Sequence, residues 1–157
     1  MKFVIPIVPT AQMRTASRAI QFADGTARGT VYKKAKQRSR EETIKAFLAR
    51  HPPEKTLGGA LLLGVWAYLP IPKSKPNWFA GTNKEFQAMA RDGTVRPITK
   101  PDFDNLMKQI KDCLTQCRYW KDDSRVVGYL PHVGKFYSDE PRWVVEVMEL
   151  RPKLYQD

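Results

Sequence analysis

The length, composition and charge of the chain set the first limits on its class. Its 157 residues fit one domain that buries a hydrophobic core, and an apolar fraction of 42% argues against intrinsic disorder. The net charge of +11 indicates a polyanionic partner. No apolar run is long enough to cross a bilayer, and the proline-broken start is unlike a signal peptide. We therefore predict a cytoplasmic protein without a membrane partner.

The positive charge is concentrated at the N-terminal end, where residues 1–40 contribute +8 of the +11. A short strand is predicted over residues 2–8. Residues 9–30 lack periodicity and contain several Gly, Ser and Thr, which predicts a long basic loop or hairpin, an arm that orders on DNA. A helix over residues 32–49 follows, with cations crowded at its start, where the helix dipole disfavours them unless phosphates supply negative charge. The predicted DNA contacts here are Arg14, Arg18, Arg28, Lys33, Lys34, Lys36, Arg38 and Arg40.

The middle of the chain alternates a strand with a helix. An apolar run that starts at Ala60 and ends in a Pro-Ile-Pro sequence predicts a buried strand. The following loop offers Lys73 and Lys75 as further DNA contacts. A helix over residues 83–91 is predicted next, with Gly93 at the position that follows its last residues.

The C-terminal part reads as two strands, over residues 125–137 and 142–150, followed by a polar tail. Together with the preceding elements, this order predicts an α+β fold with a mixed β-sheet and flanking helices. No composition shift or linker divides the chain, so residues 1–157 are expected to form a single domain.

The stretch from Lys100 to Arg125 differs from the rest because acids gather in it. It holds five of the sixteen acidic residues, Asp102, Asp104, Asp112, Asp122 and Asp123. Carboxylates this close repel one another unless a metal ion or a lysine compensates. We therefore interpret the stretch as a divalent-metal site on a nucleic-acid-binding surface, which indicates a nuclease.

An amphipathic helix carries the first of these acids. Pro101 disfavours helix at the residue before it, and Asp102 or Asp104 is placed to cap the helix. The apolar stripe of this helix comprises Phe103, Leu106, Met107, Ile110, Cys113, Leu114 and Cys117. Asp104 and Lys108 fall on the opposite face, where taken alone they also fit an ordinary solvated ion pair. The other acids nearby favour the metal site.

The chemistry expected of such carboxylates is phosphodiester hydrolysis with Mg²⁺, or Mn²⁺ as a substitute, because hard cations prefer carboxylate oxygens. No serine motif or Cys/His pair offers a rival nucleophile. Cys113 and Cys117 are interpreted as core thiols, and His51 and His132 as structural or surface residues. Two alternatives stay open at this point: a non-catalytic nucleic-acid-binding module, and a metal nuclease that acts on flaps or other branched DNA.

A family resemblance rests on the acidic stretch. The run KPDFDNLMK from Lys100 to Lys108, then Asp112, and the run WKDD from Trp120 to Asp123 resemble the signature of the RusA-type Holliday junction resolvases. Two features differ from the family pattern: Arg125 stands where members often carry Gln, and the segment over residues 12–30 is longer than in compact members.

The resemblance implies a homodimeric, magnesium-dependent endonuclease that binds four-way DNA junctions and places paired nicks symmetrically across them. By position, Asp102, Asp104 and Asp123 would be the catalytic, metal-binding carboxylates, and Asp122 a supplementary ligand. Lys108 would be the catalytic lysine.

The spacing between the acids raises a question of reach. A helix from Asp104 to about Gln116 is roughly 18 Å long. Asp123 lies seven residues further on, at most about 23 Å when extended, so a site within one chain requires the segment to run straight back along the helix. A site shared between two antiparallel helices of a dimer needs less contortion. We therefore expect sharing, and expect mixed dimers of Asp104→Asn and Asp123→Asn chains to recover one site.

Overall fold

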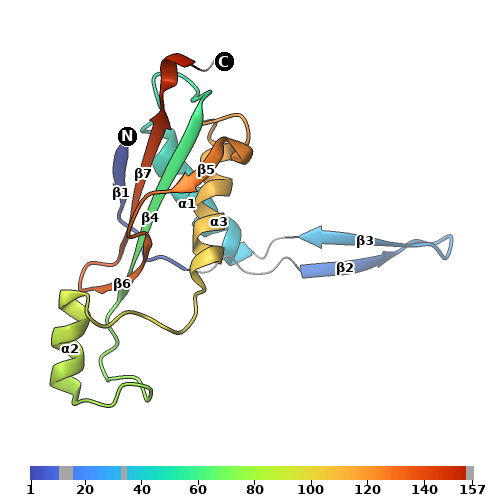
Figure 1. The fold of residues 1–157 in the computed structure, drawn as a ribbon. Coiled ribbons are helices and arrows are strands. Elements are labelled where there is room, and N and C mark those ends of the chain that lie inside the picture. Colours follow the sequence, from blue (N-terminus) through green and yellow to red (C-terminus); the bar gives the residue numbers. More distant parts are fainter. Residues whose placement is uncertain (11–15, 33–34, 155–157) are drawn as a thin grey trace.

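The structure, a computed structural model, describes residues 1–10, 16–32 and 35–154 (Figure 1). It is an α+β domain with a mixed five-stranded sheet, three α-helices and a separate two-stranded ribbon. The strands are β1 (Lys2–Ile5), β2 (Ala16–Gln21), β3 (Ala27–Tyr32), β4 (Ala60–Pro70), β5 (Val126–Tyr129), β6 (Gly134–Ser138) and β7 (Arg142–Leu150). The helices are α1 (Ala35–Ala49), α2 (Asn83–Asp92) and α3 (Phe103–Gln116), with short 3-10 helices η1 (Asp123–Arg125) and η2 (Pro152–Leu154).

The long strand β4 organises the sheet. It pairs antiparallel with β7, which in turn pairs antiparallel with β1, and it pairs parallel with β5 and β6. The mixed sheet is therefore confirmed. The single strand predicted over residues 125–137 is wrong, because β5 pairs with the first half of β4 and β6 with its second half. Between them Pro131 lacks a backbone donor and His132 adopts a positive φ of 60°, so the ladder is interrupted there.

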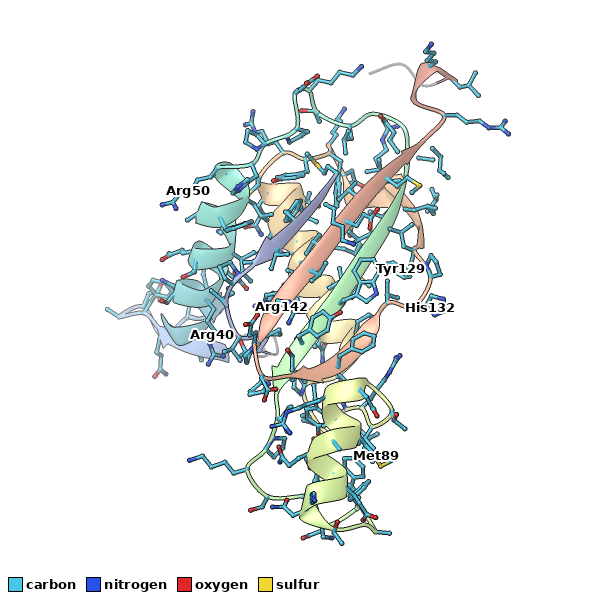
Figure 2. The ribbon with its side chains drawn as sticks, turned by 90° about the vertical axis from the view of Figure 1, so that its left-hand side faces the viewer. Arg40, Arg50, Met89, Tyr129, His132 and Arg142 are labelled. Carbon is cyan, nitrogen blue, oxygen red and sulfur yellow. The ribbon has the colours of Figure 1, made fainter. Side chains whose placement is uncertain are left out.

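The main core lies between the sheet and the helices α1 and α3, which cover the same face. Figure 2 shows the strands in front and both helices behind them. The predicted apolar stripe of α3 is confirmed, since its buried residues include Leu106, Met107, Ile110, Cys113 and Leu114. Each fully buried Leu or Ile contributes on the order of 1.5–3 kcal/mol, so packing fixes which face of α3 points outward. That outward face carries the acids.

Helix α2 forms a smaller unit at one end of the sheet. Thr82 and Glu85 form a capping box at its start, and Gly93 ends it in the left-handed conformation with a φ of 82°. Its buried residues Phe86 and Ala90 pack with Leu69 and Tyr137 in a second apolar cluster. The predicted helix and its terminal glycine are thus confirmed.

The predicted basic loop or hairpin is a hairpin over its described residues. Strands β2 and β3 pair antiparallel and project away from the body as a narrow ribbon (Figure 1). At its tip, Asp24 Oδ1 accepts hydrogen bonds from the backbone N–H and the hydroxyl of Thr26, at 2.9 and 2.6 Å. These bonds lower the pKa of Asp24, the hydroxyl bond first. Within the described residues, the helix predicted from residue 32 begins at Ala35.

The end of α3 turns the chain back toward the sheet. Arg118 adopts a left-handed conformation with a φ of 59°, and the N–H of Tyr119 bonds to Leu114 O while that of Arg118 bonds to Thr115 O. This double bonding is a Schellman motif, here with Arg instead of Gly at the left-handed position. Tyr119 and Trp120 are then fully buried, so the chain is drawn directly under the sheet edge. Among the described helices, none is long and apolar enough to cross a membrane.

Tyr119 anchors this turn to α1. Its hydroxyl lies 2.9 Å from Leu48 O and 2.6 Å from His51 O, and its single proton serves those two acceptors. Burial, together with the neighbouring Cys117, raises the pKa of Tyr119 to about 12.

We predict that Tyr119→Phe lowers the free energy of unfolding by about 1 kcal/mol at neutral pH, because it leaves buried carbonyls without a donor. In the wild type, the folded state holds the phenolic proton between pH 10 and about 12 while the unfolded state has lost it, so stability falls as pH rises through that window. The variant should lack this part of the alkaline loss. Urea unfolding across pH 7 to 12 measures both effects. Tyr129→Phe, at an exposed position, is the control, and equal curves for both variants would contradict the assignment.

Candidate active site

A cavity of about 450 Å³ lies along the outward face of α3. Acidic and basic side chains line it together. The lining residues are Phe103, Asp104, Asn105, Met107, Lys108, Lys111, Asp112, Asp123 and Tyr129. Of the predicted site residues, the cavity therefore brings together Asp104, Lys108 and Asp123.

Asp123 reaches this cavity within one chain. Its Oδ2 lies 3.8 Å from Lys111 Nζ, in an ion pair between η1 and the middle of α3. Lys111 is about 10 Å along the helix from Asp104, so Asp123 needs to return only part of the helix length. The expectation that reach favours a site shared between two chains is therefore wrong, because it assumed that Asp123 must travel back to the start of α3.

Asp102 and Asp122 lie outside the cavity lining. Asp102 occupies the N-cap position of α3, but its side chain makes no capping hydrogen bond, so the predicted side-chain cap is wrong for this residue. The Asp104 carboxylate sits in the first turn, where the helix dipole favours it. Asp122 caps η1 by accepting the Ser124 N–H at 2.8 Å, and its hydrogen bonds to Ser124 lower its pKa.

The donor set of the cavity fits a hard divalent cation in kind. Asp104, Asp112 and Asp123 offer carboxylate oxygens, the ligands that Mg²⁺ prefers. Within the described part of the chain, however, no three His, Cys, Asp or Glu side chains lie close enough together to hold a metal ion. Because Asp104 and Asp123 stand about two helical turns apart, the cavity presents its carboxylates along one wall without gathering them around one point.

Arg125 secures the short helix that carries Asp123. Its guanidinium donates a hydrogen bond to Gly58 O in the segment before β4. The residue is half-buried, which gives its departure from the family pattern a local reason: the longer cation ties η1 to the central strand.

The predicted DNA-contacting residues are spread over three regions. Arg28 and Arg38 are exposed, on the ribbon and on α1, while Arg40 is half-buried on α1. Lys73 is exposed, and Lys75 donates to Phe79 O at 2.8 Å. Arg14, Lys33 and Lys34 lie outside the described residues, and the side chains of Arg18 and Lys36 are likewise outside the description.

The cysteines and histidines behave as predicted from the sequence. Cys113 is buried and Cys117 half-buried, both as free thiols. Burial, with Glu41 nearby, raises the pKa of Cys113 to about 12, so it is protonated and unreactive near neutral pH. His51 and His132 are exposed.

Three cavity residues were not among the predicted ligands and catalytic residues: Lys111, Asp112 and Tyr129. Lys111 and Asp112 had a sequence signal, since both fall on the helix face of Asp104 and Lys108. Tyr129 had none, because its place depends on β5 pairing beside α3.

An α+β domain with carboxylates and lysines in one cavity on a basic chain is the architecture of a phosphodiester-processing enzyme. The family model described as "Endodeoxyribonuclease RusA" matches residues 6–148, and the chain belongs to this RusA endodeoxyribonuclease family.

Two relatives share parts of the chain. The uncharacterized protein YqaN of Bacillus subtilis strain 168 is 41% identical over 114 residues, which cover 73% of each chain. The crossover junction endodeoxyribonuclease rusA of Lactococcus phage r1t is 36% identical over 52 residues, which cover 33% of this chain and 38% of the phage protein.

Proposed function

We propose that this protein is a Mg²⁺-dependent endodeoxyribonuclease that resolves four-way DNA junctions by paired, symmetric phosphodiester hydrolysis. The observation that supports it most directly is the cavity that joins Asp104, Lys108 and Asp123 in a member of the RusA family. The phage relative, whose name denotes a crossover junction endodeoxyribonuclease, supports the choice of a junction over a linear duplex.

The cation's ligands are Asp104 and Asp123 on the cavity, with Asp102 as a third and Asp122 as a supplementary ligand. A bound Mg²⁺ supplies an activated water and offsets charge on the phosphoryl oxygens, and Mn²⁺ serves as a substitute. Asp102 is available for this role because its carboxylate is exposed and makes no capping bond to α3.

The lysines of α3 act on the other charges of the reaction. Lys108 is exposed on the cavity wall one turn after Asp104, where its ammonium can stabilise the anionic phosphoryl group at the transition state. Lys111 pairs with Asp123 and so holds that carboxylate toward the cavity while reducing repulsion among the acids.

The projecting ribbon is the DNA arm. An isolated two-stranded hairpin is marginally stable in water, and a β-ribbon fits the major groove of a duplex. Its tip is preformed by the Asp24–Thr26 bonds, and Arg28 stacks over Phe22 with 5.8 Å from its guanidinium carbon to the ring centre. Basic residues on α1 and around Lys73 and Lys75 extend the phosphate-binding surface.

The protein acts as a homodimer, since a four-way junction presents symmetric strands and a two-fold dimer carries two equivalent sites. Val127 and Tyr129 on β5 are 60% and 52% exposed, and Tyr129 lines the cavity. A second copy packed on this edge would bury both side chains.

We predict that Asp104→Asn and Asp123→Asn each reduce junction cleavage at least about 100-fold while junction binding persists, because both remove a charged group from the reaction centre alone. Cleavage of a synthetic four-way junction, a flap and a linear duplex is measured with Mg²⁺ or EDTA. Lys84→Met, on exposed α2, is the matched control. Unchanged cleavage by the aspartate variants would refute the proposal, and preferred cleavage of the flap would remove the junction claim.

The arm should contribute to binding but not to chemistry. Replacing Arg18 and Arg28 by Gln should reduce the slope of log affinity against log salt by about 2, since each phosphate contact contributes roughly one unit. Fluorescence anisotropy of a labelled junction over a salt series measures the slope. Lys84→Gln is the control. A slope equal to that of the wild type would exclude the arm from the interface.

Because one chain brings both aspartates to its cavity, mixed dimers of Asp104→Asn and Asp123→Asn chains should remain inactive. Differently tagged chains are co-purified, and their stoichiometry is checked by sedimentation. Dimers of wild-type and Asp104→Asn chains should nick one strand without resolving the junction. Recovery of cleavage in the first mixture would show that the site is shared, and a monomer in sedimentation would contradict the dimer.

A further inference from the structure

Lys135 joins the sheet to the segment that leads into α3. It lies on β6, paired with Ala67 of the central strand, and is half-buried. Its Nζ donates to Thr99 O at 2.8 Å and to Pro101 O at 2.9 Å. One ammonium thus holds two carbonyl groups that lie 36 and 34 residues earlier in the chain.

These two carbonyl groups flank the cis Lys100–Pro101 peptide bond immediately before Asp102. The chain therefore enters α3 from a segment whose position is set by a side chain of the sheet rather than by the helix itself. The Asp102 carboxylate makes no capping bond to the helix, so this segment is what determines where it lies.

The charge of Lys135 also acts on Asp102. Burial lowers the pKa of Lys135, and the nearby Asp102 carboxylate opposes that change. Two hydrogen bonds to carbonyl oxygens stabilise the charged ammonium, which needs acceptors when half-buried.

We propose that Lys135 is a positioning residue of the acidic site, which fixes the Thr99–Pro101 segment and thereby Asp102 at the start of α3. This inference rests on the proposed function, since it concerns how one of the proposed metal ligands is held. Lys135 acts through Asp102 and takes no part in the reaction itself.

Electrostatics and positioning predict opposite results when Lys135 is replaced. Loss of a nearby positive charge by itself favours cation binding to the acids. Loss of the two carbonyl contacts frees the segment and disfavours it, and outer-shell residues of metal sites typically contribute 10–100-fold in metal affinity. Weaker cation binding after Lys135→Met therefore identifies positioning as the dominant effect.

The experiment compares full-length wild type, Lys135→Met, Lys135→Arg and the control Lys84→Met. Thermal unfolding checks that each is folded, calorimetry with Mn²⁺ measures cation binding without DNA, and junction cleavage is titrated with Mg²⁺. We expect Lys135→Met to bind Mn²⁺ about 10-fold more weakly and to need correspondingly more Mg²⁺ for half-maximal cleavage. Lys135→Arg retains the charge and the donors and should restore most of the binding.

A double variant tests whether the effect passes through Asp102. If it does, Lys135→Met should cause no further loss of Mn²⁺ binding in an Asp102→Asn background. Should Lys135→Met fail to fold, Lys135→Gln, which keeps a donor without the charge, is measured in its place.

The outcomes separate the two claims. Equal or tighter Mn²⁺ binding by a folded Lys135→Met protein overturns the positioning role while the wild-type nuclease stands, and so does a full loss in the Asp102→Asn background. A wild type that neither binds Mn²⁺ nor cleaves the junction overturns the proposed function and this inference together.

Discussion

The structure depends on how α3 packs. Its apolar stripe is buried against the sheet beside α1, which leaves the acidic face directed outward. The buried pair Tyr119 and Trp120 then draws the chain back at once, and the Trp120 indole N–H donates to Thr115 Oγ1 at 2.8 Å to close the turn on the helix. Two hydrophobic requirements, one for each side of the turn, thus place Asp104 and Asp123 on one cavity. Neither requirement involves the acids themselves.

Cations accompany the acids at each point where the backbone approaches the cavity. Lys111 pairs with Asp123, Lys135 holds the segment before Asp102, and Arg125 ties the short helix of Asp123 to Gly58 O. Each bond is modest where solvent reaches it, because exposed pairs contribute only about 0–1 kcal/mol. Their common effect is geometric: they restrain three backbone segments from which the carboxylates project.

Much of this arrangement was predictable from local sequence patterns. The stripe of α3, the buried strand β4 and the glycine end of α2 follow from periodicity and turn chemistry, which act over a few residues. The division between β5 and β6 was not, because it is imposed by pairing with distant halves of β4. The return of Asp123 was missed for a similar reason: a Schellman turn with Arg118 in place of glycine carries no sequence signature. Tyr129 reached the cavity through the same long-range pairing.

The separation of Asp104 from Asp123 has a consequence for folding. In structural metal sites the ligands converge, and the unfolded apoprotein gains much of its stability from the ion. Here lysines on α3 and β6 already compensate part of the acidic charge, and the cavity wall is held by the core beneath it. The fold therefore has no need of a cation to exist, so the cation's binding energy remains available for chemistry on the phosphate. A nuclease built in this way is folded before metal or DNA arrives, and its activity is governed by metal supply without risk to its stability.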